Sequence, residues 1–365
     1  MKELVLVCIC YFLGLSASSS SSLPMEQRNI QLLGICNPIL DITATVPPEF
    51  LAKYNLKEND AILAGEEHQD LGQDVLSSFP VQFSAGGSGQ NTLRTAQFIL
   101  PKGSAAYVGC IGDDENGKIM RENVQNEGLI VEYQVDSQTP TGTCCVLING
   151  IHRSLVANLS AANNLKIDHF MKPQVDSLIQ QAKYFYATGF ILTVCPEVLL
   201  YLGKHASENG KTFFFNLSAP FLSQFFSKEM MSVLPYADVI IGNESEAEAF
   251  AKANSLPSGY SLEQIAQAIA NLPKENASRS RIVVITHGPE PTIVFHDGIV
   301  EHFPVTPIDS ALIKDTNGAG DVFCGGFIAQ YIRGKPLKEC VAFGNMLAGK
   351  IIQVSGAALD PKMFE

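Results

Sequence analysis

The sequence DTNGAGD at residues 315–321 leads directly into the apolar run VFCGGFIAQYI at residues 322–332. Small residues at the start of a helix let a ligand approach backbone N–H groups that have no intrahelical partner, and the helix dipole adds to their attraction for an anion. We therefore expect a helix over 319–332 whose N-terminus binds a phosphate group through Gly318, Ala319 and Gly320.

Asp321 lies one turn inside this predicted helix. A carboxylate there could accept the proton of a substrate hydroxyl as that hydroxyl attacks the γ-phosphoryl group of a nucleotide. The alternative is that Asn317 caps the helix and Asp321 only complements its dipole. Gly325 and Gly326 count against the alternative, because glycine inside a helix is costly unless something must approach closely.

Composition narrows the class of protein. The chain has 365 residues, of which 46% are hydrophobic and 17% charged, so it is not disordered. Its net charge of −12 argues against nucleic acid or an anionic membrane as a partner. The nine cysteines form no CxxC pair and the histidines no HExxH motif, which favours reduced core thiols and gives a zinc site little support.

The first residues resemble a secretory signal: Lys2, an apolar run over 4–15 and small residues around Ala17. Against export, three of the four N-x-S sequons, at 158, 216 and 243, fall in segments expected to line the site, where a glycan would block it. We expect residues 1–24, a leader with a serine-rich joint, to be disordered or removed. Residues 25–365 then form the working protein, in the cytoplasm with the nucleus as a second compartment.

Apolar runs alternate with amphipathic stretches from residue 30 onward. Strands are expected at residues 31–36, 105–110, 184–187, 212–216, 238–241, 281–286 and 292–296. Helices are expected at residues 91–100, 117–127, 173–183, 197–208, 245–253, 262–271 and 319–332. This alternation predicts an α/β fold with a mainly parallel sheet covered by helices on both faces.

Two segments, about 38–84 and 140–160, break this rhythm. The second contains alternating apolar residues and an Asn149-Gly150 turn, which is typical of a hairpin. We expect both segments to form a small β-rich lid over a larger α/β domain made from the remainder, because a covered site excludes water.

A match to the GxxxxGK phosphate-binding pattern at 112–118 is misleading. Ile119 stands where a Ser or Thr hydroxyl would hold Mg²⁺, and acidic residues crowd a loop that should be neutral. We expect instead a turn that opens a helix at Gly117.

Several motifs together carry a family resemblance: DTNGAGD at 315–321, AGGSGQN at 85–91, GICNPILD at 34–41, NLSAPF at 216–221 and GNESE at 242–246. The chain resembles the ribokinase-like kinases, also called the phosphofructokinase B family, and within it the adenosine-phosphorylating branch. The resemblance implies a ribokinase-like α/β fold with a β-rich lid. It also implies transfer of the γ-phosphoryl group of ATP to the 5′-hydroxyl of adenosine, giving AMP and ADP in purine salvage.

The resemblance also assigns roles to residues. Asp321 would be the general base, Gly318, Ala319 and Gly320 the anion hole, and Arg153 a basic residue that moves toward the phosphates. The residues implied to bind adenosine are Asn37, Asp41, Gly86, Gly87, Ser88, Asn91, Cys144, Leu155, Phe190, Phe221 and Asn317. Thr286, Gly288 and Asn345 would bind the nucleotide, and Asn243 and Glu246 would organise Mg²⁺ through water.

The residues alone leave alternatives open. Asp41 would equally well be a turn residue, and Arg153 would be a solvated charge. The alternative for Leu155, Phe190 and Phe221 is ordinary core packing, and the alternative for Asn243 and Glu246 is a helix-capping pattern. Other functions also stay open, namely another nucleoside or sugar kinase of the same fold, or a non-catalytic adenosine-binding protein. We expect a monomer that uses Mg²⁺ with ATP, with a monovalent cation such as K⁺ as an optional further cofactor.

Overall fold

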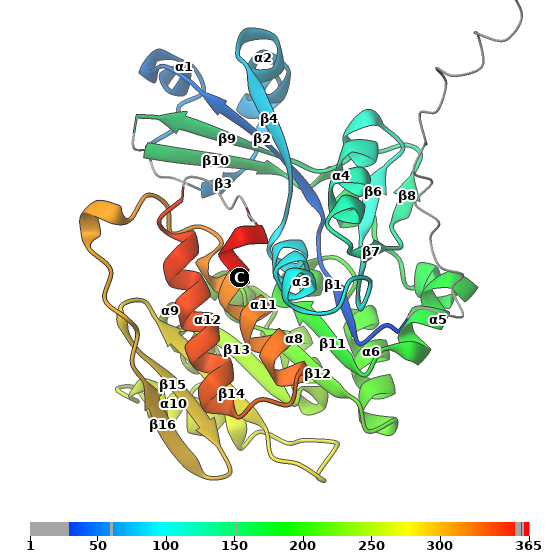
Figure 1. The fold of residues 1–365 in the computed structure, drawn as a ribbon, viewed down its shortest axis with the longest axis vertical. Coiled ribbons are helices and arrows are strands. Elements are labelled where there is room, and N and C mark those ends of the chain that lie inside the picture. Colours follow the sequence, from blue (N-terminus) through cyan, green and yellow to red (C-terminus); the bar gives the residue numbers. More distant parts are fainter. Residues whose placement is uncertain (1–28, 59–60, 151, 355–358, 360, 365) are drawn as a thin grey trace, which may run out of the picture.

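The computed structural model describes residues 29–58, 61–150, 152–354, 359 and 361–364. The expectations for the N-terminal leader therefore lie outside the described residues. Figure 1 shows the described chain as a large layered body with a smaller layer of strands above it.

A mainly parallel sheet forms the centre of the large body. Among the described residues it has nine strands in the order β16-β15-β14-β13-β12-β11-β1-β5-β7. These are β1 (Leu32–Ile35), β5 (Ala105–Val108), β7 (Ile130–Val131), β11 (Tyr184–Thr188), β12 (Thr212–Asn216), β13 (Val239–Asn243), β14 (Ile282–His287), β15 (Glu290–His296) and β16 (Ile299–Phe303). Strands β14, β15 and β16 pair antiparallel at one edge and the other neighbours pair parallel, which confirms the predicted sheet.

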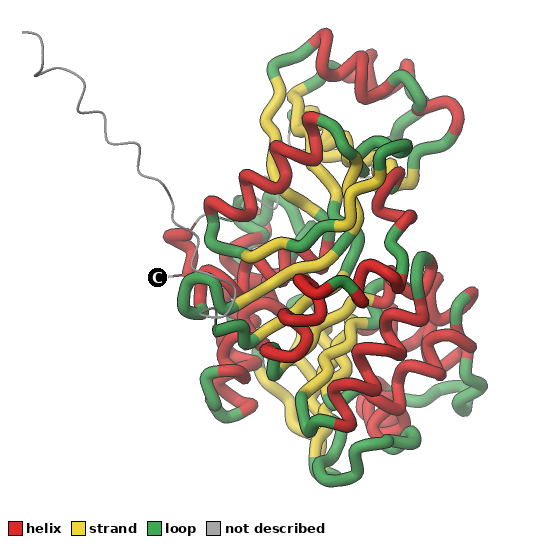
Figure 2. Tube along the Cα trace, turned by 90° about the vertical axis from the view of Figure 1, so that its right-hand side faces the viewer, coloured by secondary structure: helices red, strands yellow, loops and turns green. Residues whose placement is uncertain are grey.

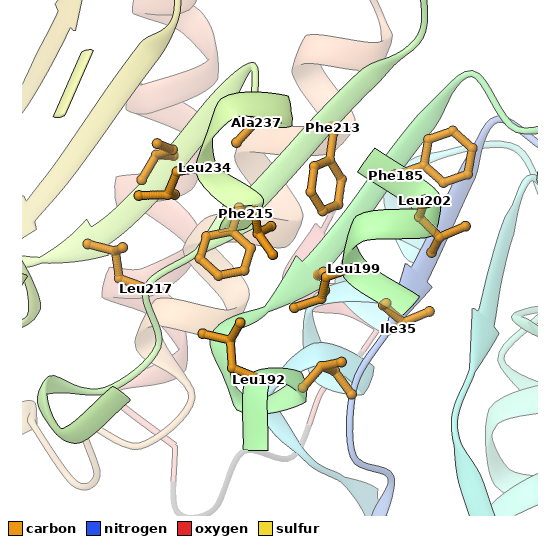
Figure 3. Close-up of a cluster of buried hydrophobic side chains, with 14 of the residues drawn as sticks. Ile35, Phe185, Leu192, Leu199, Leu202, Phe213, Phe215, Leu217, Leu234 and Ala237 are labelled. Carbon is orange, nitrogen blue, oxygen red and sulfur yellow. The ribbon is translucent and has the colours of Figure 1, made fainter. Parts of the chain in front are cut away.

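Helices cover both faces of this sheet, as Figure 2 shows edge-on. One face packs against α5 (Pro173–Gln181), α6 (Pro196–Glu208), α8 (Ser227–Val233), α9 (Glu244–Ala253) and α10 (Leu262–Ala270). The other packs against α3 (Ser88–Ile99), α4 (Glu115–Asn126), α11 (Ala319–Ile332) and α12 (Leu337–Ile351). Consecutive strand residues point to opposite faces: Phe185 and Phe213 enter the first core, drawn in Figure 3, and Tyr186 and Phe214 enter the second.

A second sheet lies over one end of the first. Its five strands, as far as the structure describes the chain, run in the order β3-β10-β9-β2-β4. They are β2 (Ile39–Thr45), β3 (Ala61–Leu63), β4 (Val81–Gly86), β9 (Thr143–Asn149) and β10 (His152–Asn158), with α1 (Pro48–Lys53) and α2 (Leu71–Ser78) beside them in Figure 1. Strands β9 and β10 pair antiparallel next to Asn149, which confirms the predicted hairpin.

The helix near Gly117 begins earlier than predicted. Helix α4 starts at Glu115, because the Asp114 side chain caps it by accepting a 2.8 Å hydrogen bond from the Gly117 backbone N–H. The same carboxylate accepts the Thr141 hydroxyl and backbone N–H. One of the acidic residues that argued against a phosphate loop therefore caps a helix beside the two-stranded sheet of β6 (Cys110–Gly112) and β8 (Gln134–Asp136).

Three further findings apply to the described part of the chain. It contains no helix long and apolar enough to cross a membrane. It contains no group of three or more His, Cys, Asp or Glu side chains that could hold a metal ion directly. Its seven cysteines are free, buried thiols.

Candidate active site

The N-terminus of α11 is the helix end predicted to bind an anion. Gly318 caps the helix with φ of 77°, a left-handed conformation that suits glycine, so Asn317 is not the cap that the alternative required. The N–H of Ala319 lies 3.3 Å from the Thr316 carbonyl, and the first intrahelical bond runs from Val322 to Gly318. The two amides between them, of Gly320 and Asp321, have no intrahelical acceptor and can bind an anion.

Asp321 lies in the first turn of α11 and contacts the start of α3. Its Oδ1 accepts a 2.6 Å hydrogen bond from the Ser88 hydroxyl, and its Oδ2 accepts one from Asn91 Nδ2 at 3.2 Å. Burial raises the pKa of Asp321 to about 6, and the two hydrogen bonds oppose the rise. A carboxylate with this pKa is ionised at neutral pH, yet basic enough to take up a proton.

Asp41 lies on β2 opposite β4, where Gly86 leaves room for it. A Cβ on Gly86 would lie 2.5 Å from the Asp41 carboxylate, so any other residue would displace that carboxylate. Burial raises the pKa of Asp41 to about 7; Arg153 and Arg94 lower it and Asp321 raises it. Asp41 thus lies within β2 and close enough to Asp321 to feel its charge, and it is not a turn residue at a strand end.

Asn37 and Gly87 complete this corner. Asn37 is buried, and its Oδ1 has no hydrogen-bond partner among the described residues. Gly87 has φ of 90°, and a Cβ on it would lie 2.4 Å from the Asn37 carbonyl oxygen, so glycine is required. A buried acceptor without a partner is costly, and a ligand hydroxyl would satisfy it.

Arg153 on β10 forms an ion pair with Asp315, and both side chains are buried. Asp315 Oδ1 also accepts the Asn317 backbone N–H at 2.9 Å and its Nδ2 at 2.8 Å. The alternative of a solvated charge for Arg153 is therefore wrong. One carboxylate connects the small sheet to the loop that precedes the anion-binding helix.

The residues predicted to hold a base come from both layers. Cys144 on β9 is the parallel partner of Asp41, and Leu155 follows on the neighbouring strand β10. From the large layer come Phe190, in the turn after β11, and Phe221, in α7 (Pro220–Phe225). The two phenylalanine rings contact each other, with centroids 6.3 Å apart and planes tilted by 41°.

Asn243 and Glu246 form the capping box of α9. Asn243 Oδ1 accepts the Glu246 N–H at 2.9 Å, and Glu246 accepts the Asn243 backbone and side-chain N–H groups at 3.0 Å each. Burial raises the pKa of Glu246 to about 7, with smaller contributions from Glu244 and Asp321. The capping interpretation is correct. The carboxylate also lies close enough to Asp321 to feel its charge.

Thr286, Gly288 and Asn345 line one cavity of about 310 Å³. The start of α11 forms part of its wall, through Ala319 and Gly320. Asn345 Oδ1 accepts the Thr292 hydroxyl at 2.9 Å, while its Nδ2 is buried without a partner in the described chain. The cavity is thus largely apolar, with one free amide donor and the anion-binding helix end at its border.

Sequence reasoning missed much of this wall and some polar partners. The missed wall residues are Pro289, Thr292, Val305, Thr306, Pro307, Ile308, Ile313, Thr316, Phe323, Ala348, Gly349 and Ile352. Most of them belong to no motif, and the apolar character of segment 303–308 could have indicated only four of them. Asp315 lies inside the quoted motif, but its partner Arg153 is 162 positions away.

Comparison with known proteins agrees with this geometry. Residues 48–363 match the family described as "pfkB family carbohydrate kinase". The chain belongs to the pfkB family. Among curated pfkB relatives, "Adenosine kinase 2" of Arabidopsis thaliana is 43% identical over 332 residues, which cover 91% of this chain and 96% of that protein.

Solved pfkB structures give the same result. An adenosine kinase of Anopheles gambiae in complex with P1,P4-di(adenosine-5) tetraphosphate has a TM-score of 0.82 and 42% identity, covering 90% of this chain and 97% of that chain. An adenosine kinase of Schistosoma mansoni in complex with 2-fluoroadenosine has a TM-score of 0.82 and 38% identity, with coverages of 90% and 97%.

Proposed function

We propose that this pfkB-family protein is an adenosine kinase, which transfers the γ-phosphoryl group of ATP to the 5′-hydroxyl of adenosine and releases AMP and ADP. The observation that carries the proposal is the position of Asp321. It lies in the first turn of α11, whose N-terminal residues border the apolar cavity. Its carboxylate accepts hydrogen bonds from Ser88 and Asn91 of α3. In this proposal, Asp321 acts as the base next to the helix end that borders the nucleotide cavity.

Adenosine would bind with its ribose at the second carboxylate. Asp41 offers two acceptors to a vicinal diol, and the buried Oδ1 of Asn37 accepts a further donor. The adenine would lie against Phe190, Phe221 and Leu155, which supply apolar surface from both layers. This arrangement leaves the 5′-hydroxyl facing Asp321.

The transfer itself needs positioning and charge stabilisation. Asp321 takes the proton of the 5′-hydroxyl as the oxygen attacks the γ-phosphorus. The amides at the start of α11 and the guanidinium of Arg153 then stabilise the negative charge of the transferring group. Arg153 reaches the phosphates by exchanging its contact with Asp315 for them.

The described residues fit Mg²⁺ bound to ATP phosphates and water better than Mg²⁺ held by the protein directly. No three-ligand cluster is present in the described chain, while the buried Glu246 carboxylate lies near Asp321 beside Asn243. Glu246 and Asn243 would hold its water ligands, and Mg²⁺ would neutralise phosphate charge. Activity measured after removal of Mg²⁺ with EDTA tests the first ion, and activity measured with tetramethylammonium in place of K⁺ tests the second.

We further propose that the small sheet, about 38–84 and 140–160, acts as a lid, and that the protein is a monomer in a reducing compartment. The Arg153–Asp315 pair between the small sheet and the phosphate loop supports the lid, and the buried free thiols of the described chain support the compartment. Light scattering tests the monomer.

The test of the function is ATP-dependent phosphorylation by protein that starts at Met25, with adenosine, guanosine and ribose as acceptors. Selective turnover of adenosine supports the proposal. Preference for guanosine or ribose would replace it by another nucleoside or sugar kinase, and adenosine binding without turnover would replace it by a non-catalytic binding protein.

A further inference from the structure

Arg94 is a buried arginine on α3 to which the family resemblance assigns no role. It is 4% exposed and forms a bidentate ion pair with Glu127, the C-cap residue of α4, with Nε–Oε2 and Nη2–Oε1 distances of 2.6 Å each. Burying two charges is costly, so a pair of this kind is a weak source of stability. Stability alone therefore does not explain why the guanidinium is buried here, and the nitrogen that Glu127 does not bind, Nη1, has to be considered.

That donor, Nη1, faces the active site. It lies 3.3 Å from Asn91 Oδ1, and it also donates to the Ala85 carbonyl. Asn91 is three positions before Arg94 on the same helix, so the two side chains share a face. The other end of the Asn91 amide donates to Asp321 at 3.2 Å.

An asparagine amide has one accepting end and one donating end, and arginine can only donate. With Arg94 at one side, the oxygen of Asn91 must face the guanidinium and the NH₂ group must face Asp321. A flipped amide would place its NH₂ against a cation and its oxygen against a carboxylate. Arg94 thus selects the orientation in which Asn91 holds the base.

The bond to Ala85 extends this effect to β4. Ala85 precedes Gly86, which backs the Asp41 carboxylate, and Gln90 donates to the Gly86 carbonyl at 2.9 Å. Two buried side chains of α3 therefore hold the end of β4 that forms the site.

We propose that Arg94 is a positioning residue for phosphoryl transfer, which fixes the amide of Asn91 so that its NH₂ group holds the Asp321 carboxylate toward the substrate hydroxyl. The inference rests on the proposed role of Asp321. Glu127 keeps the guanidinium in place by binding its other two donors.

The test compares Arg94→Met, Arg94→Lys, Asn91→Ala and the double variant Asn91→Ala/Arg94→Met, with kcat per folded molecule at saturating adenosine. Arg94→Met is expected to lower kcat about 10- to 100-fold, because small misplacements of reacting groups have effects of this size. Lysine retains one donating nitrogen with a positive charge and should recover part of the loss. Since Arg94 acts through Asn91, the double variant should be no slower than Asn91→Ala alone.

Arg279→Met is the matched control. Arg279 forms a bidentate pair with Asp238, at 2.8 Å for each bond, beside the opposite end of β13. Arg279→Met should lower the thermal midpoint of unfolding and leave kcat unchanged. If Arg94→Met behaves in the same way, Arg94 is only structural and the proposal is overturned.

The proposal would also be overturned if Arg94→Met lowered kcat by the same factor in Asn91→Ala as in the unaltered protein. Arg94 would then act independently of the Asn91 amide. If Arg94→Met does not fold, the same cycle is run with Arg94→Lys and the same coupling is expected. Failure of the proposed role of Asp321 looks different, because Asp321→Asn would then retain full turnover. Failure of the proposed function would already appear in the unaltered protein, as preference for guanosine or ribose or as binding of adenosine without turnover.

Discussion

The Ser88 hydroxyl donates a 2.6 Å hydrogen bond to the Asp321 carboxylate, although 233 positions separate the two residues. Each residue lies in the first turn of its helix, α3 and α11, and each helix follows a glycine with a positive φ, Gly87 or Gly318. The two glycine-rich motifs of the sequence therefore meet at one carboxylate.

Activity should fall in acid. The pKa of Asp321 is about 6 and that of Asp41 about 7, both above the ordinary range for aspartate. Both must be ionised, one to take up a proton and the other to accept ribose hydroxyls. As the pH falls from 7 to 6, protonation removes both functions, so kcat/KM for adenosine should decrease with the coupled apparent pKa values of the pair. A profile that stays flat from about pH 5 to 8 would contradict this.

The charge of Asp321 raises the pKa of Asp41, whereas Arg153 and Arg94 lower it. Asp321→Asn should therefore extend adenosine binding to lower pH. Calorimetric titration of adenosine at several pH values measures the shift, and an unchanged dependence on pH would show that the two carboxylates are not coupled.

Asp315→Asn should destabilise the protein. It leaves the buried guanidinium of Arg153 without its carboxylate, and breaking one side of a buried pair typically costs about 3–5 kcal/mol. Urea unfolding measures the loss. The double variant Arg153→Met/Asp315→Asn should recover much of it, because the guanidinium that lost its carboxylate is removed as well. An equally unstable double variant would argue against the ion pair as the cause.

The sequence predicted the layers well, because each depends on local periodicity. Helix α12, Leu337–Ile351, was not predicted, since Gly344 and Gly349 weaken its helical pattern. The reason for Gly344 is tertiary: a Cβ there would lie 2.8 Å from the Phe323 ring of α11. Packing against a neighbouring helix is information that a single segment does not carry.

Gly325 and Gly326 had indicated a close approach, but the partners are helices and not a ligand. A Cβ on Gly325 would lie 2.5 Å from Thr95 Cβ on α3, and one on Gly326 would lie 2.8 Å from Leu347 on α12. The motif predicted Asp321 and the helix start, whereas the contacts of Arg94 with Glu127 depend on how distant helices pack.

Gly325→Ala should therefore cost about 1–3 kcal/mol by overpacking, because both Thr95 and the Thr92 carbonyl oxygen, 2.6 Å from the new Cβ, lie in its way. Gly72→Ala is the matched control, since it lies in α2 with nothing within 4 Å of a new Cβ. That variant should gain up to about 1 kcal/mol from helix propensity. Equal unfolding free energies for the two variants would contradict the packing argument.

Phe190→Ala should weaken adenosine binding, because it removes aromatic surface from the expected base pocket. We expect KM for adenosine to rise about 10-fold or more, as for the loss of 1.4 kcal/mol or more of binding free energy. Phe225→Ala, at a ring that is 75% exposed and one turn beyond Phe221, should leave KM unchanged. An unchanged KM in Phe190→Ala would place the adenine elsewhere.

The measurement that tests the account most directly is the turnover of adenosine by Asp321→Asn beside the unaltered protein, with adenosine binding measured on the same samples. Loss of a general base typically lowers the rate about 10²–10⁴-fold, so kcat should fall at least about 10²-fold while adenosine still binds. Turnover at the unaltered rate would show that Asp321 is not the base.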